Sequence, residues 1–208
     1  MARPKGDIEP RILHAARGRF LADGVDAASL RHIARDAGTS IGMIYYYFPT
    51  KDDLFLAVID EVYDKFLVDL EQALAPEGST RERLRRMYRR VAHTTDDEVE
   101  IVRLVAREIM VSSARRDRII ERMQRGHLPL ALRTLGEGML SGELRRDVHP
   151  LVLMMATFAL AGPPQIMRRA LGDRMPVPGA PAGEDLADLL VDVLFDGIGG
   201  SGGISEDG

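Results

Sequence analysis

The 208-residue chain contains no cysteine and no tryptophan, and only 5% of its residues are aromatic. Without cysteine it can have no disulfide bond, no cysteine-ligated zinc site and no thiol nucleophile, which fits a reducing compartment. Histidine is scarce too, and His93, His127 and His149 lack the four-residue spacing of a helical metal site. We therefore expect no metal and no cofactor.

The sequence also lacks a long apolar run. The longest, residues 151–162, ends at two prolines and falls short of the roughly 20 residues that cross a bilayer. The N-terminal stretch MARPKGDIEP has no apolar segment of the kind found in secretion signals. We expect a cytoplasmic protein with no membrane partner. No nucleophile motif, phosphate-binding loop or carboxylate pair is present, so we do not expect an enzyme.

What the sequence does have is the composition of an ordinary globular protein, with 45% hydrophobic and 29% charged residues. The formal net charge of −4 counts against a nucleic-acid partner. The charge is unevenly distributed, however, because the chain up to Lys51 has eight basic residues against five acidic ones. The N-terminal quarter is therefore weakly basic and the remainder acidic.

Hydrophobic periodicity predicts three helices in this basic segment. The first ends at Gly24, since glycine suits a left-handed helix cap. The second follows Ser29 as N-cap and ends before Gly38, and the third follows Ser40 and covers residues 41–47. Two short helices joined by a three-residue turn containing glycine form a helix-turn-helix unit, whose second helix enters the DNA major groove.

The rest of the chain predicts more helices and no strands, because no stretch alternates with period two. We expect helices at about residues 51–75, 81–91, 97–113, 118–140, 150–171 and 184–195. The arginines at 81, 85, 86, 89 and 90 are expected to form a solvated helix face rather than a second nucleic-acid patch. Residues 199–208 form a glycine-rich tail that we expect to be disordered. The fold class is all-α.

Three of the five tyrosines stand together at residues 45–47. Successive helical residues point about 100° apart, so the three rings cannot all face the core. A phenol suits a side chain that lies on the sugar-phosphate backbone, and Lys51 at the next helix N-terminus adds a positive charge. A buried aromatic cluster is the alternative. It is disfavoured because Ile44 and Phe48, four residues apart, already supply an inward face.

The stretch ASLRHIARDAGTSIGMIYYYFPTKDDLFLAVI, preceded by ILHAARGRFLADGVDAAS, resembles the DNA-binding domain of the TetR family of bacterial transcriptional regulators. The likeness spans about residues 8–60. It rests on a Phe-three-residues-Gly helix end, an Ile-Ala-two-residues-Ala-Gly turn, and a string in which Gly, Tyr, Phe and Lys are each separated by two residues. The resemblance implies DNA contacts by Arg31, Ser40, Ile41, Gly42, Met43, Tyr45, Tyr46, Tyr47 and Lys51.

Two of these positions depart from the family pattern. Met43 stands where a small residue is common, and Ile41 offers no hydrogen-bond donor or acceptor. Direct base readout by the recognition helix is therefore weak. We hypothesise that thymine methyl contacts, Arg31, the basic pair Arg3 and Lys5, and DNA shape contribute much of the sequence preference.

A single helix-turn-helix makes few phosphate contacts, so such modules usually pair on two half-sites. In the TetR family the last two helices of each subunit form an intersubunit four-helix bundle. Residues 151–160 are apolar on nearly every side and need cover on every side. The expected dimer residues are Leu151, Met154, Leu186, Leu189, Leu190, Val193 and Leu194. The alternative is that both helices fill the core of their own subunit.

The resemblance further implies a pocket among the middle helices for a small-molecule effector. Methionine adapts to varied apolar shapes, and histidine or arginine could supply polar groups. The candidates are Met87, His93, Arg107, Met110, Met123, His127, Met155 and Phe158. For any single methionine, plain core packing is the alternative.

These features together predict a ligand-responsive TetR-like repressor that binds a palindromic DNA operator as a homodimer and is released by a small apolar or amphipathic ligand. The expected domains are a helix-turn-helix DNA-binding domain at 1–53, a larger helical ligand-binding and dimerisation domain at 54–198, and a flexible tail at 199–208. The alternative is a helical sensor or adaptor without operator binding, which the weak base-reading surface would suit.

Overall fold

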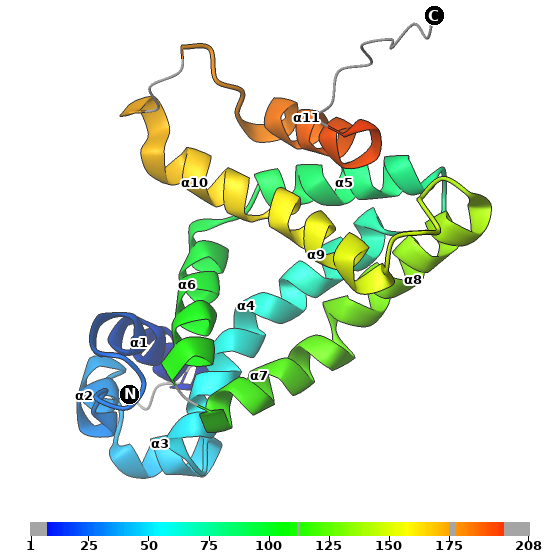
Figure 1. Cartoon of the computed structure of the whole chain (residues 1–208). Helices are drawn as coiled ribbons and strands as arrows, with labels where there is room; N and C mark the ends of the chain where they lie inside the picture. The colour runs from blue at the N-terminus through cyan, green and yellow to red at the C-terminus, as the bar shows by residue number, and fades with distance from the viewer. Residues whose placement is uncertain (1–7, 112, 175–177, 198–208) are drawn as a thin grey trace, which may run out of the picture. The chain divides into compact units, whose positions relative to one another are not determined.

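A computed structural model describes residues 8–111, 113–174 and 178–197, and within these ranges the chain is helical and has no strand (Figure 1). The all-α prediction is confirmed. The helices are α1 (Ile8–Asp23), α2 (Leu30–Asp36), α3 (Ile41–Tyr47), α4 (Lys51–Ala73), α5 (Thr80–Ala92), α6 (Asp96–Val111), α7 (Ser113–Arg125), α8 (His127–Ser141), α9 (Pro150–Ala161), α10 (Pro163–Leu171), the 3-10 turn η2 (Gly172–Arg174) and α11 (Gly183–Asp196). The tail at 199–208 and the Arg3 and Lys5 arm lie outside the described residues.

The chain divides into two compact units, and neither is continuous in sequence. The first unit contains residues up to 68 together with 95–125, and the second contains 69–94 together with the chain from 126 onward. Helix α4 passes from one unit into the other. The first unit thus keeps α6 and α7 with the helix-turn-helix, whereas the sequence-based division falls after residue 53. That functional division remains a prediction.

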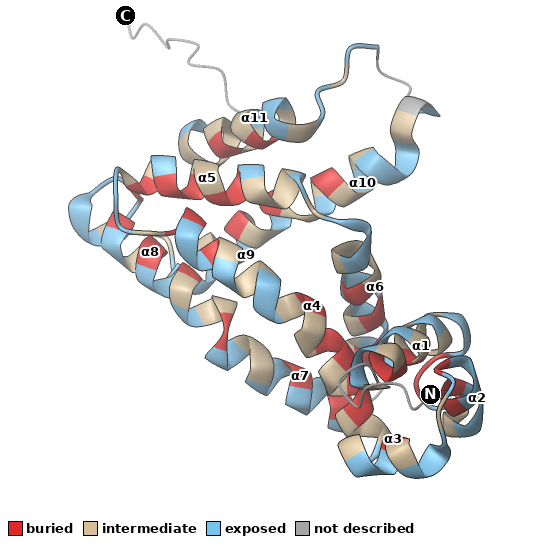
Figure 2. Cartoon of the chain, turned by 180° about the vertical axis from the view of Figure 1, so that it is seen from behind, coloured by how far each residue is buried: buried red, intermediate tan, exposed pale blue. Residues whose placement is uncertain are grey.

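The core of the first unit is built from one apolar face of each of its helices (Figure 2). Phe20 of α1 and Phe55 of α4 are fully buried and meet edge to face, with ring centroids 6.1 Å apart. The other fully or nearly fully buried members include Ile12, Ala16, Ile33, Ile44, Leu54, Val58 and Leu104. Burying such side chains stabilises the fold by about 1.5–3 kcal/mol each, so the helix-turn-helix depends on α4 and α6 for its core.

The turns of this unit follow the local sequence signals. Gly24 and Gly38 have φ of +83° and +61°, a region that strains residues with a Cβ. Ser40 Oγ accepts a hydrogen bond from Met43 N at 3.3 Å and caps α3. Ser29 occupies the N-cap position of α2, but its side chain makes no capping hydrogen bond. At α4, Thr50 and Asp53 accept hydrogen bonds from each other's backbone N–H at 3.1 Å.

The second unit packs α5 against α8, α9 and α11. Tyr88 of α5 is fully buried and its hydroxyl donates to the backbone oxygen of Thr157 in α9 at 2.8 Å. Ala187 and Val191, one turn apart on α11, are fully buried. The buried stripe of α11 is therefore narrow, and its larger leucines are left half-buried or exposed.

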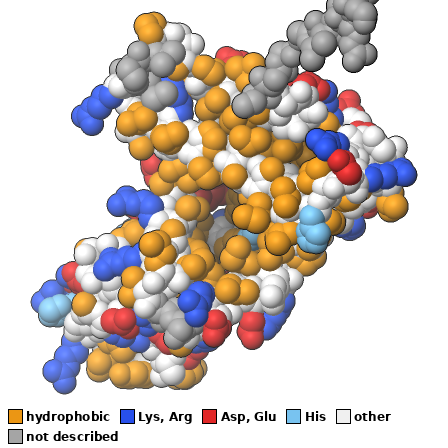
Figure 3. Space-filling view, in the orientation of Figure 1, with side chains coloured by type: hydrophobic (Ala, Val, Ile, Leu, Met, Phe, Trp, Pro, Cys, Tyr) orange, Lys and Arg blue, Asp and Glu red, His pale blue; other side chains and the backbone are white. Residues whose placement is uncertain are grey.

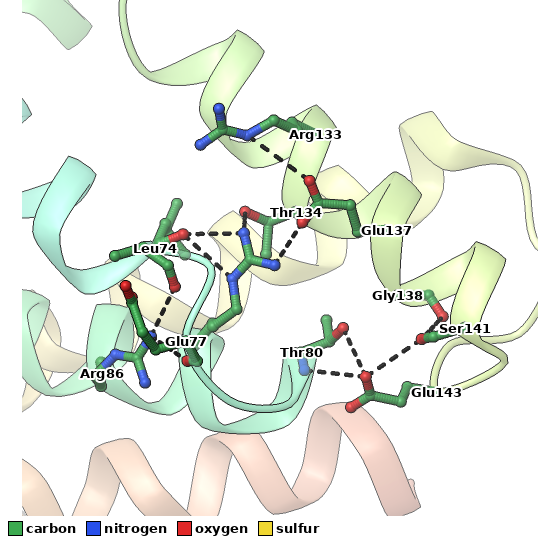
Figure 4. A network of polar contacts seen from close by, with 12 residues as sticks. Leu74, Glu77, Thr80, Arg86, Arg133, Thr134, Glu137, Gly138, Ser141 and Glu143 are labelled. Carbon is green, nitrogen blue, oxygen red and sulfur yellow. Dashed lines mark hydrogen bonds and ion pairs between the residues drawn. The ribbon is translucent and has the colours of Figure 1, made fainter.

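Two buried or half-buried arginines hold the turn between α4 and α5 (Figure 4). Arg83 donates to Leu74 O from Nε at 3.2 Å and from Nη2 at 2.9 Å, and to Thr134 Oγ1 at 3.1 Å. Arg86 donates to the backbone oxygens of Ala73, Ala75 and Glu77. These bonds satisfy carbonyls that the end of α4 leaves without helical partners.

Two long helices predicted from the sequence are each divided in the structure. The stretch 118–140 is split between α7 and α8 at Gly126, whose φ of −105° and ψ of −112° are not helical. The stretch 150–171 is split at Gly162, before Pro163 and Pro164. A proline has no N–H and cannot continue the preceding hydrogen-bond ladder, so α10 begins anew at Pro163. Both predictions of a single helix were wrong.

Candidate nucleic-acid interface

Helix α3 has one face in the core and one in solvent. Ile44 and Phe48 are buried, while the side chains of Tyr45 and Tyr46 are 51% and 77% exposed. Tyr47 is half-buried against the core and meets Tyr46 edge to face, with ring centroids 5.2 Å apart. Two phenols are therefore available on the outer surface of the helix, and the third supports them.

The N-terminal turn of α3 presents a small, mostly apolar surface. Ser40, Ile41 and Gly42 are exposed and Met43 is half-buried. A Cβ at position 42 would approach only Ser40 Oγ, at 3.7 Å, so this turn leaves room for a close neighbour. The Ser40 hydroxyl is the polar side-chain group of this turn, and it already accepts from Met43 N. This surface suits contact with thymine methyl groups better than hydrogen-bonded base readout.

Lys51 does not extend freely into solvent. Its Nζ donates to the backbone oxygens of Asp26 at 2.6 Å and Ala28 at 3.2 Å, both in the turn between α1 and α2. The lysine thereby fastens this turn to the first residue of α4. Arg31 of α2 is exposed. A phosphate bound at the α4 N-terminus would compete with these carbonyls for the ammonium group.

A buried arginine of α7 lies beside this lysine, and sequence reasoning missed it. The Arg115 side chain is only 7% exposed and contacts three carboxylates. Its donors reach Glu108 Oε2 of α6 at 2.6 Å, Asp26 Oδ2 at 2.7 Å and Asp52 Oδ1 of α4 at 3.1 Å. The hydrogen bond from Arg115 lowers the pKa of the Asp26 carboxyl below its ordinary value. Residue 115 falls between the helices predicted at 97–113 and 118–140, so neither its place on α7 nor its partners could be read from the sequence.

The residues expected to bind an effector are divided between the two units, and their role remains a prediction. In the first unit, Met123 packs against the core and Met110 is exposed. The Arg107 guanidinium lies against Gly24, so close that a Cβ added to this glycine would be 2.6 Å from Arg107 Nη2. In the second unit, Met87 is buried, Met155 is exposed, and exposed His93 lies 2.8 Å from Glu184 Oε1. The structure does bring His127 and Phe158 together edge to face, with ring centroids 5.4 Å apart. Burial lowers the pKa of His127.

The expected dimer residues lie on α9 and α11 of the second unit. Leu151 and Leu189 are about half exposed. Met154, Leu186, Leu190, Val193 and Leu194 are half-buried. Val152 and Met155 extend the exposed apolar surface of α9, and hydrophobic side chains gather over α9 and α10 in Figure 3. Few single domains leave so many large apolar side chains of one helix in water.

Comparison with known proteins identifies the fold and the N-terminal motif. A model of bacterial regulatory proteins of the tetR family matches residues 12–58. The fatty acid metabolism regulator protein of Bacillus subtilis (strain 168) is 23% identical over 138 residues, covering 66% of this chain and 71% of that protein. The chain belongs to the TetR family. The TetR-family match contains every predicted DNA-contact residue from Arg31 to Lys51, whereas the effector and dimer candidates lie beyond it.

Two further TetR-family likenesses differ in extent. The HTH-type transcriptional activator FasR of Mycolicibacterium smegmatis is 34% identical over 82 residues, but the alignment covers only 39% of this chain and 37% of that protein. The structure of the regulator FadR from Bacillus subtilis in complex with stearoyl-CoA has a TM-score of 0.70 at 20% identity, covering 91% of this chain and 99% of that chain. At this identity the structural likeness shows the TetR-family fold alone.

Proposed function

We propose that this transcriptional regulator binds a palindromic DNA operator as a homodimer and acts as a repressor that a small apolar or amphipathic ligand releases. The main support is the exposed face of α3, which lies in the segment that matches the TetR-family model. On this face two solvent-exposed phenols follow an apolar N-terminal turn. On DNA, this turn would face the major groove, and the hydroxyls of Tyr45 and Tyr46 would bond phosphate oxygens. A cytoplasmic location and the absence of enzymatic activity belong to the same proposal.

The apolar surface of α9 and α11 supports the homodimer. Residues 150–171, taken as one stretch, are long and apolar enough to cross a membrane. Core helices of soluble proteins can have the same length and composition. The break at Gly162 and the arginines at 168 and 169 of α10 favour protein cover over a bilayer. A second copy of the same surface supplies that cover with two-fold symmetry, which a palindromic operator requires.

The ligand is proposed to enter the second unit, and His127 with Phe158 is its best-supported contact pair. Because the Bacillus subtilis relative is named for fatty acid metabolism and the FadR structure contains stearoyl-CoA, an acyl-CoA is the first probe to test. A ligand shifts the regulator only if it binds the two states with different affinity. Release from operator is expected on stearoyl-CoA addition, and tighter operator binding would contradict release by this ligand.

Selection of the purified protein on a random duplex library tests operator binding. We expect enrichment of an inverted repeat, and a loss of affinity for all sequences in Lys51→Ala and Tyr45→Phe. The Lys51→Ala change should also reduce the slope of log affinity against log salt by about one. Lys65→Ala removes the same charge from an exposed position of the same helix and is the matched control. No enrichment at low salt by folded, dimeric protein would favour the alternative of a sensor or adaptor without operator binding.

A second experiment tests the dimer. Leu189→Arg and Met155→Asp place charges on the exposed apolar surface of α11 and α9. Both should give monomers in sedimentation equilibrium and should lose the inverted repeat. Leu132→Arg, at an exposed apolar position of α8, should remain dimeric. Dimers in all three variants would exclude this surface.

A further inference from the structure

The proposed phosphate site at Lys51 is surrounded by negative charge. Asp52 and Asp53 follow the lysine directly in α4, and Asp26 provides one of the carbonyls that Lys51 holds. The Asp26 side chain is 73% exposed, so its charge reaches the solvent through which DNA would approach. Three carboxylates beside one ammonium group would repel a phosphate backbone unless they are neutralised.

Arg115 bonds two of these carboxylates at once and offsets part of their charge. Its Nη2 donates to Asp26 and its Nη1 to Asp52, while its Nε donates to buried Glu108. A guanidinium can do this because it carries five donors in a fixed plane, whereas an ammonium is a compact point charge. Asp53 has a separate partner, since Arg118 Nη2 donates to its Oδ1 at 2.9 Å.

Arg115 also fixes the turn between α1 and α2, which Lys51 binds. Lys51 binds the backbone oxygens of Asp26 and Ala28, and Arg115 binds the side chain of Asp26. Ala28 is buried and its N–H donates to Gly24 O at 3.0 Å. The turn between α1 and α2 is therefore held on one side by the first residue of α4 and on the other by α7.

We propose that Arg115 is a positioning residue for DNA binding, which offsets part of the charge of Asp26 and Asp52 and holds the turn that orients Lys51. The proposal rests on the proposed operator binding and adds to it a residue of α7, outside the segment that matches the family. Glu108 completes the arrangement by fixing the guanidinium from α6. Arg115 thus acts on the phosphate site through other side chains.

The double variant Glu108→Gln with Arg115→Gln tests this without changing the net charge. It removes both members of the buried ion pair and takes the Arg115 guanidinium away from Asp26 and Asp52. We expect operator affinity to fall at least about ten-fold at low salt and the loss to shrink as salt rises, because the added repulsion is screened. The control is Asp64→Asn with Arg122→Gln, which also keeps the net charge and breaks an ion pair between α7 and α4 farther along both helices. It should bind within about two-fold of wild type.

Rescue separates charge compensation from mere structural support. Adding Asp26→Asn and Asp52→Asn to the double variant should restore most of the affinity, because the unpaired charges are gone. The same two changes in the wild-type background should have a smaller effect, since Arg115 already offsets part of the charge of those carboxylates there. Equal gains in both backgrounds would show independent charges and overturn the proposal.

The remaining outcomes are also decisive. Wild type, the double variant and Lys51→Ala are titrated with operator in parallel. If the double variant binds operator as well as wild type does, the positioning role is overturned while operator binding stands. If wild type binds no duplex, operator binding fails and this inference fails with it. Should the double variant be unfolded by circular dichroism, Arg115→Lys replaces it, since one ammonium cannot bridge Asp26 and Asp52. Weaker, salt-sensitive binding by Arg115→Lys supports the proposal, and wild-type affinity overturns it.

Discussion

Each unit of the chain joins helices through a row of basic side chains, but the first row includes one nearly buried member, Arg115, and the second row is exposed throughout. In the first unit, Arg115, Arg118 and Arg122 of α7 face carboxylates of α4, and Arg115 with Glu108 is nearly excluded from water. In the second unit, Arg81, Arg85 and Arg89 of α5 and the C-cap residue His93 face acidic residues of α11. These partners are, in the same order, Asp196, Asp192, Asp188 and Glu184, so each row repeats every four residues. The side chains of this second row are 30–67% exposed.

The contrast shows what ion pairs contribute in the two settings. An exposed pair contributes little to stability, although a repeated row favours one register of two antiparallel helices. A buried charge is costly without its partner, so the Arg115 cluster makes the position of α7 and the charge beside Lys51 depend on each other. The row on α11 thus secures a helix whose other side is proposed to form the dimer, and the row on α7 is linked to the proposed DNA site.

The largest expected effect comes from Arg115→Met. The substitution leaves Glu108, which is 2% exposed, without its guanidinium. We expect the free energy of unfolding to fall by about 3–5 kcal/mol, because an uncompensated buried charge remains. Urea denaturation at unchanged m-value measures it. Glu108→Gln with Arg115→Gln should lose far less, and a loss under about 1 kcal/mol in Arg115→Met would remove the distinction between the two rows.

Arg83→Met tests whether burial matters more than membership of a row. Arg83 is 5% exposed and lies in the second unit, outside the row that faces α11. Its loss deprives Leu74 O and Thr134 Oγ1 of donors (Figure 4), so we expect a destabilisation of about 2–3 kcal/mol by urea denaturation. Arg133→Met is the control, since that exposed side chain lies 4.0 Å from Glu137 and should contribute almost nothing. Equal effects would contradict the argument from burial.

Arg85→Gln measures one step of the exposed row. Its Nη2 lies 3.0 Å from Asp192 Oδ1, and an exposed pair of this kind contributes about 0.2–1 kcal/mol. The loss should disappear at about 1 M salt, where screening is strong. Arg86→Gln on the same helix gives the comparison, because Arg86 bonds backbone carbonyls and its effect should persist in salt. A salt-independent loss in Arg85→Gln would mean that packing, and not charge, holds α11.

The helix-turn-helix could be predicted from sequence because its signals are local. Gly24 and Gly38 mark turns of positive φ, Ser40 caps α3, and Ile44 with Phe48 sets its inward face. Each signal acts within a few residues, so no knowledge of the rest of the chain was needed. The outward direction of Tyr45 and Tyr46 followed from the same periodicity.

The two arginine rows could not be assigned in the same way, because their partners are distant in sequence. Arg85 and Asp192 are 107 residues apart, and the sequence alone predicts only a solvated face for the arginines of α5. A periodic signal existed, since acidic residues recur every fourth position from Glu184 to Asp196 opposite arginines of the same spacing. Arg115 gave no such signal, because its three partners come from three separate elements.

The smallest effect is expected at His127, and it appears only on acidification. Burial lowers the pKa of His127 below its ordinary value of 6.5, so the folded protein favours the neutral imidazole and the unfolded chain binds the proton first. Stability is therefore fully present above about pH 6.5 and is lost as the pH falls through the lowered pKa. His127→Phe, which keeps a ring against Phe158, should flatten this fall when urea midpoints are compared from about pH 7 to about pH 5. If His127→Phe leaves the fall in stability with pH unchanged, protonation of His127 costs no folding free energy. The surroundings of Phe158 would then be as accessible to water as the exposed arginine row of the second unit.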